Sequence, residues 1–106
     1  MKKELYDNFE YFRKYQYKVK NKQELVGIIR SNRSIKRYED DFTPKSTTDL
    51  NWIDTSNITD MGDIFFETNF DGNISKWDVS NVEILDTTFC SSMFNGDLSE
   101  WDVSNV

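Results

Sequence analysis

One short motif recurs at a fixed interval and constrains the fold more than any other feature of this sequence. Trp-Asp-Val-Ser-Asn-Val at residues 77–82 returns at residues 101–106, and residues 53–58 carry a weaker copy, Ile-Asp-Thr-Ser-Asn-Ile. The aligned aspartates Asp54, Asp78 and Asp102 are 24 residues apart, and no insertion interrupts the register after residue 49. Periods of about 20 to 50 residues are typical of solenoids, whose units bury their apolar sides against one another.

Within one unit, the apolar residues suggest how the chain folds. Ile74, Trp77, Val79, Val82 and Leu85 follow a spacing close to that of leucine-rich repeats, which place a short strand at the centre of the motif. We therefore expect a strand over residues 76–80 with Trp77 and Val79 inward, and Ile53 inward in the first unit. Asparagine is the fifth residue of the motif in each copy, where its amide can bond exposed backbone groups; these residues are Asn57, Asn81 and Asn105.

The rest of each unit predicts a return segment and a tight turn. Met61, Ile64 and Phe65 have helical spacing, so we expect one or two helical turns over residues 59–66 and again over residues 83–90. Gly72 and Gly96 each follow a phenylalanine by two residues, and we expect these glycines to supply positive φ angles for tight turns.

The first 48 residues lack the repeat and predict a cap. Apolar spacing predicts a helix over residues 2–14, alternation predicts a strand over residues 15–20, and a second helix should run to about Ser31. Asn21 with Glu24 resembles a capping box, and Asn32 is the expected end of that helix. Residues 33–48 read as a polar connector. We therefore divide the chain into a cap and connector (1–48) and a repeat region (49–106) of about 2.4 units.

Charge is distributed unequally between these two regions. Residues 1–48 hold 12 Lys/Arg against 7 Asp/Glu, a net charge of +5, whereas residues 49–106 hold Lys76 alone against 12 acids, a net charge of −11. An acidic body should repel nucleic acid and attract basic protein surfaces. The chain contains no histidine and one cysteine, which removes the commonest general base and any intramolecular disulfide. We expect no catalysis, no cofactor and no metal.

The repeat resembles the BspA-like leucine-rich-repeat proteins of bacteria and their relatives in mycoplasmas and phages. The resemblance rests on Trp-Asp-Val-Ser-Asn-Val, a Phe-containing return segment and Phe-Asn-Gly-Asp-Leu-Ser, and it covers residues 49–106. It implies an α+β fold: a short right-handed leucine-rich-repeat-like solenoid of 24-residue units with an N-terminal helical cap. It also implies a non-catalytic binding role, often in adhesion at the cell surface.

Two groups of charged residues are candidate partner-binding sites. The expected outward strand face carries Lys76, Asp78 and Ser80, with Asp54 and Asp102 one repeat away on either side. These aspartates are either a hot spot for a basic partner or a structural ladder with nearby Ser and Asn side chains, and we favour the ladder. Arg33, Lys36 and Arg37 form a basic patch that can contact nucleic acid. We favour a solvated connector there, and we expect Cys90 to be buried and inert.

Three functions fit these observations. The first is a protein-interaction module whose acidic solenoid binds a protein partner. The second is a small phage or mobile-element inhibitor that imitates the charge of nucleic acid and blocks a basic channel of a nucleic-acid-handling defence enzyme. The third is a truncated fragment of a surface adhesin, suggested by the end of the sequence at Val106.

Two further expectations concern location and assembly. Acidic residues at Glu4, Asp7 and Glu10 interrupt any apolar signal segment, and no apolar run has membrane-spanning length, so we expect a cytoplasmic protein. The last unit exposes Trp101, Val103 and Val106, and we expect this end to pair with a second copy in a two-fold homodimer.

Overall fold

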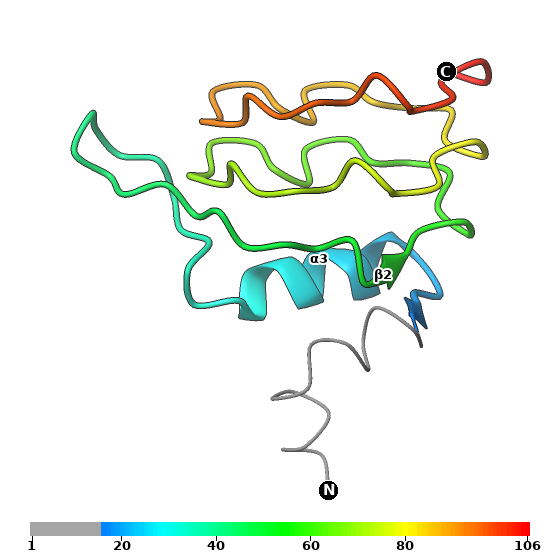
Figure 1. Cartoon of the computed structure of the whole chain (residues 1–106), viewed down its shortest axis with the longest axis horizontal. Coiled ribbons are helices and arrows are strands. Elements are labelled where there is room, and N and C mark those ends of the chain that lie inside the picture. The colour runs from blue at the N-terminus through cyan, green and yellow to red at the C-terminus, as the bar shows by residue number, and fades with distance from the viewer. Residues whose placement is uncertain (1–15) are drawn as a thin grey trace, which may run out of the picture.

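The computed structural model describes residues 16–106 and arranges them in three stacked levels (Figure 1). Its regular elements are, in order, strand β1 (Tyr17–Lys18), helix α3 (Lys22–Ser31) and strand β2 (Ile53–Asp54), and β1 pairs with β2 in parallel. The helix expected over residues 2–14 lies outside the described residues. No helix among residues 16–106 has both the length and the apolar content to cross a bilayer.

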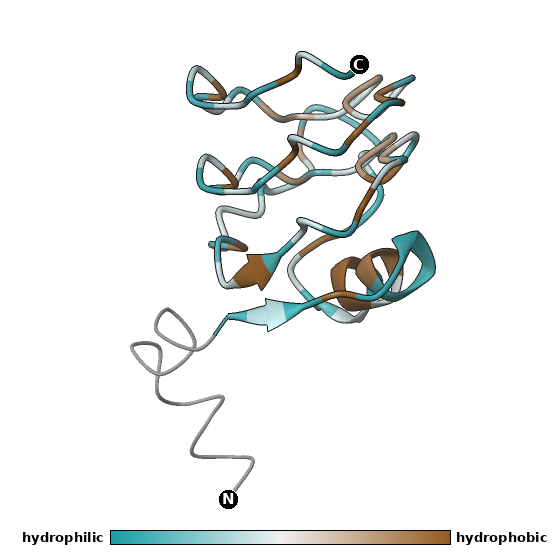
Figure 2. Cartoon of the chain, turned by 90° about the vertical axis from the view of Figure 1, so that its right-hand side faces the viewer, coloured by the Kyte–Doolittle hydropathy of each residue, from teal (hydrophilic) through white to brown (hydrophobic). Residues whose placement is uncertain are grey.

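Helix α3 begins and ends where its capping residues predict. The Asn21 side chain accepts a hydrogen bond from the Glu24 amide, and the backbone of Asn32 closes the last turn by bonding the Ile29 carbonyl. Leu25 and Ile29 are buried, and Figure 2 shows the hydrophobic residues of α3 on the side that faces the stacked levels. The predicted bounds and caps of this helix are confirmed.

The three levels follow the 24-residue interval. We call residues 35–58 the first coil, residues 59–82 the second coil and residues 83–106 the third coil; α3 lies beside the first coil and beneath the second (Figure 1). Single parallel pairings join Ser46 to Phe70 and Asp49 to Asn73 between the first two coils, and Asp60 to Ile84 between the last two. Residues of the polar connector therefore take part in the first coil.

Apolar side chains from α3 and successive coils form one core. Ile53, Trp77 and Val79 are buried as expected, and the neighbouring repeat positions bring aromatic rings into stacks. The ring centroids of Trp77 and Trp101 are 6.5 Å apart, and those of Phe70 and Phe94 are 5.9 Å apart. Stacked aromatic pairs of this kind add to the stabilisation from apolar burial.

Two expected elements are wrong. Residues 76–80 form no regular strand, because the Trp77 and Val82 amides bond Ile74 and Val79 within their own coil instead of a neighbouring coil. Residues 59–66 form no helix: the φ angle of Asp63 is +65°, a left-handed conformation that breaks a right-handed helical turn. The corresponding third-coil segment has a φ of +55° at Thr87.

The expected role of the glycines is also wrong. Neither Gly72 nor Gly96 has a positive φ angle. A Cβ at Gly72 would instead lie 1.8 Å from the Thr48 carbonyl oxygen of the coil below, which no side chain can tolerate. This glycine is required by the close approach of two backbones.

Candidate functional site

Asp54, Asp78 and Asp102, which we call the aspartate column, lie in three equivalent turns. Each carboxylate accepts a hydrogen bond at 3.0 Å from a serine amide two residues later, in the pairs Asp54–Ser56, Asp78–Ser80 and Asp102–Ser104. This bond pattern is an Asx turn, in which the side chain fixes the direction of the backbone. The aspartates therefore have a role in the backbone turns, and Asp78 and Asp102 are also exposed to solvent.

Hydrogen bonds lower the pKa values of Asp78 and Asp102. The Ser80 hydroxyl and then the Ser80 amide lower the pKa of Asp78, against smaller opposing effects of burial and of the negative charge on Asp102. The Ser104 hydroxyl and amide lower the pKa of Asp102 in the same way. Because both pKa values lie below the ordinary value of an aspartate, both groups are negatively charged at neutral pH.

Lys76 and Ser80 lie near the aspartate column, but both side chains already have hydrogen-bond partners. The Lys76 ammonium donates to a Glu100 carboxylate oxygen at 3.0 Å, and the Ser80 hydroxyl donates to Asp78 Oδ1 at 2.6 Å. Glu100 lies one repeat after Lys76, so the 24-residue offset was the signal that could have revealed this pair. With Lys76 paired, the aspartates dominate the charge of this side.

The basic patch lies at the other end of the coils. Arg33, Lys36 and Arg37 are exposed, and they follow the C-terminal end of α3, away from β2 and its Asp54 (Figure 1). A guanidinium nitrogen of Arg37 lies 3.9 Å from a Glu67 carboxylate oxygen. The structure therefore does not bring the acidic and basic candidates together.

Asn69, which the sequence analysis did not single out, holds the backbone next to the basic patch. Its buried amide donates to the carbonyls of Ser34 and Pro44, and its side-chain oxygen accepts from the Lys36 amide at 2.6 Å. The only sequence signal was that Met93 occupies the same position one repeat later.

The three residues expected to form a dimer contact, Trp101, Val103 and Val106, are not all exposed to solvent. Trp101 is half-buried, with its ring stacked on Trp77 and its indole N–H donating to the Ile74 carbonyl at 3.0 Å. Val103 and Val106 are exposed.

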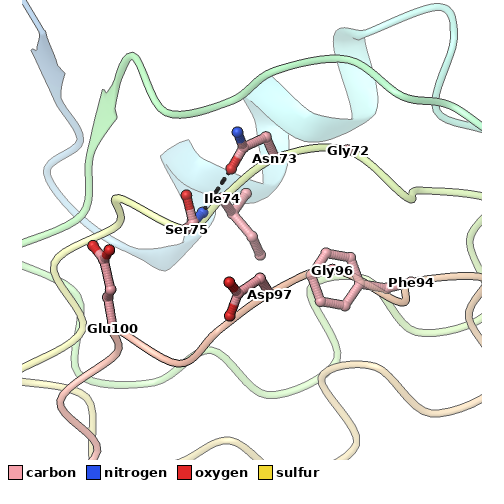
Figure 3. A pocket seen from close by; sticks show the side chains of 8 residues that line it. All are labelled: Gly72, Asn73, Ile74, Ser75, Phe94, Gly96, Asp97 and Glu100. Carbon is pink, nitrogen blue, oxygen red and sulfur yellow. Dashed lines mark hydrogen bonds between the residues drawn. The ribbon is translucent and has the colours of Figure 1, made fainter.

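A shallow hollow of about 350 Å³ lies between the second and third coils. Figure 3 shows it bordered by the turns at Gly72 and Gly96, the Phe94 ring and the carboxylates of Asp97 and Glu100. The Ser99 amide and hydroxyl lower the pKa of Asp97. The lining contributes the carboxylates of Asp97 and Glu100, and the Lys76 ammonium lies 3.0 Å from a Glu100 carboxylate oxygen.

Cys90 and the potential metal ligands are the remaining candidates. Cys90 is exposed, so its expected burial is wrong. The aligned Phe66 in the second coil is also exposed, which shows that this repeat position points outward. Among residues 16–106, no three His, Cys, Asp or Glu side chains are grouped closely enough to hold a metal ion.

Comparison with known proteins identifies one family. No curated protein and no solved structure matches the sequence. A family model described as "Mycoplasma protein of unknown function, DUF285" matches residues 32–106, which include the three coils and exclude α3. Since this match covers well over half of the chain, the protein belongs to the DUF285 family of mycoplasma proteins.

Proposed function

We propose that this protein is a non-catalytic protein-interaction module that binds a basic partner through the aspartate column. The observation that carries the proposal is the set of three Asx turns, which repeat a carboxylate at the same place in successive coils. Because each turn already holds its carboxylate, binding costs little side-chain ordering, and regularly spaced carboxylates suit Arg and Lys side chains.

The architecture that we propose for this module is a right-handed, BspA-like leucine-rich-repeat solenoid with α3 as its N-terminal cap. Contacts that repeat with the sequence interval support it. The Asn81 amide donates to the Ser56 carbonyl at 2.8 Å, and the Asn105 amide donates to the Ser80 carbonyl at 2.5 Å. Likewise, the Trp77 and Trp101 indoles each donate to a carbonyl 27 residues earlier. We propose that the module acts in the cytoplasm.

A second candidate function is inhibition of a nucleic-acid-handling enzyme by charge mimicry. The net charge of −11 over residues 49–106 favours it, because a column of fixed negative charges resembles a phosphate backbone to a basic channel. The two functions predict different salt dependence. Binding by mimicry should weaken steeply between low and high salt, whereas docking with an apolar component should weaken little.

Affinity capture with matched variants tests the proposal. The test variant is Asp78→Asn with Asp102→Asn, since asparagine retains the Asx turn and removes the charge. The control is Glu39→Gln with Asp41→Asn, which removes two charges from the exposed part of the connector. Proteins retained by the wild type and the control but lost from the test variant would support the proposal. Equal retention by all three chains would contradict it.

A further inference from the structure

The connector presents a phenylalanine that is almost fully exposed to solvent. Phe42 is 92% exposed, and Figure 1 shows that its part of the connector projects beyond one end of the stacked coils. A ring that buries so little area in its own chain adds little to the stability of the fold. Phe42 is therefore available for contact with a second molecule.

Hydrogen bonds fix the backbone around this ring. The Asp40 carboxylate accepts from the Phe42 amide at 2.9 Å, and the Asp40 carbonyl accepts from the Thr43 amide at 3.1 Å. The Thr43 hydroxyl oxygen in turn accepts from the Asp40 amide at 3.2 Å. We call Asp40, Phe42 and Thr43 the Phe42 tip; it holds a carboxylate next to the exposed ring.

The chain on either side of the Phe42 tip is fastened to the second coil. The Tyr38 amide donates to the Glu67 carbonyl at 2.7 Å, and the Asn69 side-chain amide donates to the Pro44 carbonyl at 2.7 Å. A segment that is held at both ends and across its turn has little conformational freedom left to lose when it binds.

A hollow of about 340 Å³ lies at the same end of the molecule as the Phe42 tip (Figure 1). The end of α3, the start of the first coil and the second coil all contribute to it, and we call it the α3 hollow. Its apolar lining consists of Ile29, Ile35, Ile64 and Phe66, and Phe66 is 40% exposed. The lining therefore offers uncovered apolar area to an occupant.

The α3 hollow also has positive charge that the chain does not neutralise. Its two carboxylates have partners: Glu67 lies 3.9 Å from the Arg37 guanidinium, and Asp63 accepts from a hydroxyl of the third coil. The side-chain cations of Arg30 and Lys36, also in the lining, form no ion pair within residues 16–106. An occupant that carries an apolar group beside a carboxylate complements this lining.

We propose that the Phe42 tip of one copy of this chain docks in the α3 hollow of a second copy. The Phe42 ring contacts the apolar lining, as aromatic anchors do in interface pockets, and the Asp40 carboxylate faces Arg30 and Lys36. Because tip and hollow lie at the same end of the molecule, a two-fold axis there forms both contacts at once. The proposal is independent of the aspartate column.

This dimer differs from the one expected through Trp101, Val103 and Val106, and substitutions at exposed residues separate the two. Phe42→Ser removes the ring, and Arg30→Glu with Lys36→Glu reverses the charge of the α3 hollow. Val106→Ser removes exposed apolar area at the other proposed contact. Unchanged urea midpoints report that each variant is folded.

Sedimentation equilibrium of the full chain, at concentrations up to about 1 mM, measures the association. We expect the wild type to dimerise, and we expect Phe42→Ser and the double charge reversal each to weaken the dimer by at least about tenfold. Val106→Ser should leave the dimer unchanged. A wild type that stays monomeric throughout, or a loss of association with Val106→Ser as large as with Phe42→Ser, would overturn the proposal.

NMR on a mixture of isotope-labelled and unlabelled wild-type chains locates the contact directly. We expect intermolecular NOEs between the Phe42 ring protons of one copy and the methyl groups of Ile35 and Ile64 of the other. A dimer that lacks these NOEs would also overturn the proposal, because the ring would then lie outside the hollow.

Discussion

The second and third coils have closely similar residues at equivalent positions but differ in how they are covered. Val79 and Val82 of the second coil are 1% and 0% exposed, whereas Val103 and Val106 of the third coil are 47% and 57% exposed. The motif Trp-Asp-Val-Ser-Asn-Val is identical in both. The difference shows that residue type sets which side chains point inward, while the presence of a covering coil decides how much area they bury.

The largest expected effect separates Phe65 from Phe89. Phe65 is fully buried and stacks on Phe70 at 4.4 Å and on Trp77 at 5.9 Å. We expect Phe65→Ala to lower the free energy of unfolding by about 3–5 kcal/mol, the usual range for a buried phenylalanine. Phe89→Ala should cost roughly half as much, because one side of its ring lacks a covering coil. Urea denaturation followed by tryptophan fluorescence measures both, and equal losses would contradict the comparison.

Asn69 and Met93 give the next contrast, because they occupy one repeat position with different chemistry. Asn69→Leu leaves the Lys36 amide and the carbonyls of Ser34 and Pro44 without the Asn69 side chain. We expect a loss of about 2–4 kcal/mol, since buried polar groups left unsatisfied are costly. Met93→Leu should cost less than about 1.5 kcal/mol, as volume-conserving apolar changes usually do. The urea midpoints of the two variants provide the measurement, and a larger loss for Met93→Leu would refute the contrast.

A smaller effect should distinguish the two valines of the repeated motif. Val79→Ala removes buried methyl groups and should cost roughly 2 kcal/mol, whereas Val103→Ala should cost about 0.5 kcal/mol or less. Thermal melts of the two variants under one set of conditions test this. Extending the chain after Val106 by a second copy of residues 83–106 should raise the cost of Val103→Ala toward that of Val79→Ala. If it does not, the third coil is not covered as the second coil is.

The sequence interval predicted which residues meet, and helix capping predicted α3. Ile53, Trp77 and Val79 are buried as their alternation indicated, and Asn81 and Asn105 bond backbone carbonyls as expected, although Asn57 has no such bond among the described residues. These predictions succeeded because a repeat specifies contacts twice, once in each copy. The Asp78–Ser80 turn was not predicted, because the alternation of residues 76–80 suggested a strand there.

The backbone path between these contacts was not predictable from the pattern. The spacing of Met61, Ile64 and Phe65 suits a helix, and all three are buried, yet Asp63 adopts a left-handed conformation. Apolar spacing indicates only which side chains face inward. An irregular coil, in which the Met61, Asp63 and Phe65 amides bond carbonyls of the third coil, has the same spacing as a helix. The role of Gly72 required knowing that Thr48 approaches it from the coil below.

The smallest expected effect concerns pH and the aspartate column. Hydrogen bonds from Ser80 and Ser104 lower the pKa values of Asp78 and Asp102 in the folded chain, below their ordinary value of 3.8. A lowered folded pKa contributes stability that is present above the unfolded pKa and is lost as the pH falls through the folded pKa. We therefore expect the urea midpoint to be constant near neutral pH and to decrease below about pH 4.

The two aspartates should also influence each other across the coils. The negative charge of Asp102 raises the pKa of Asp78, opposing the stronger effect of Ser80. Asp102→Asn retains the turn and removes that charge, so the pKa of Asp78 should fall further. An NMR titration of the Asp78 carboxyl carbon measures the shift, with Glu39→Gln as a control for a general loss of charge. A rise in the pKa of Asp78, or an equal fall in the control, would mean that the column does not couple from the third coil to the second.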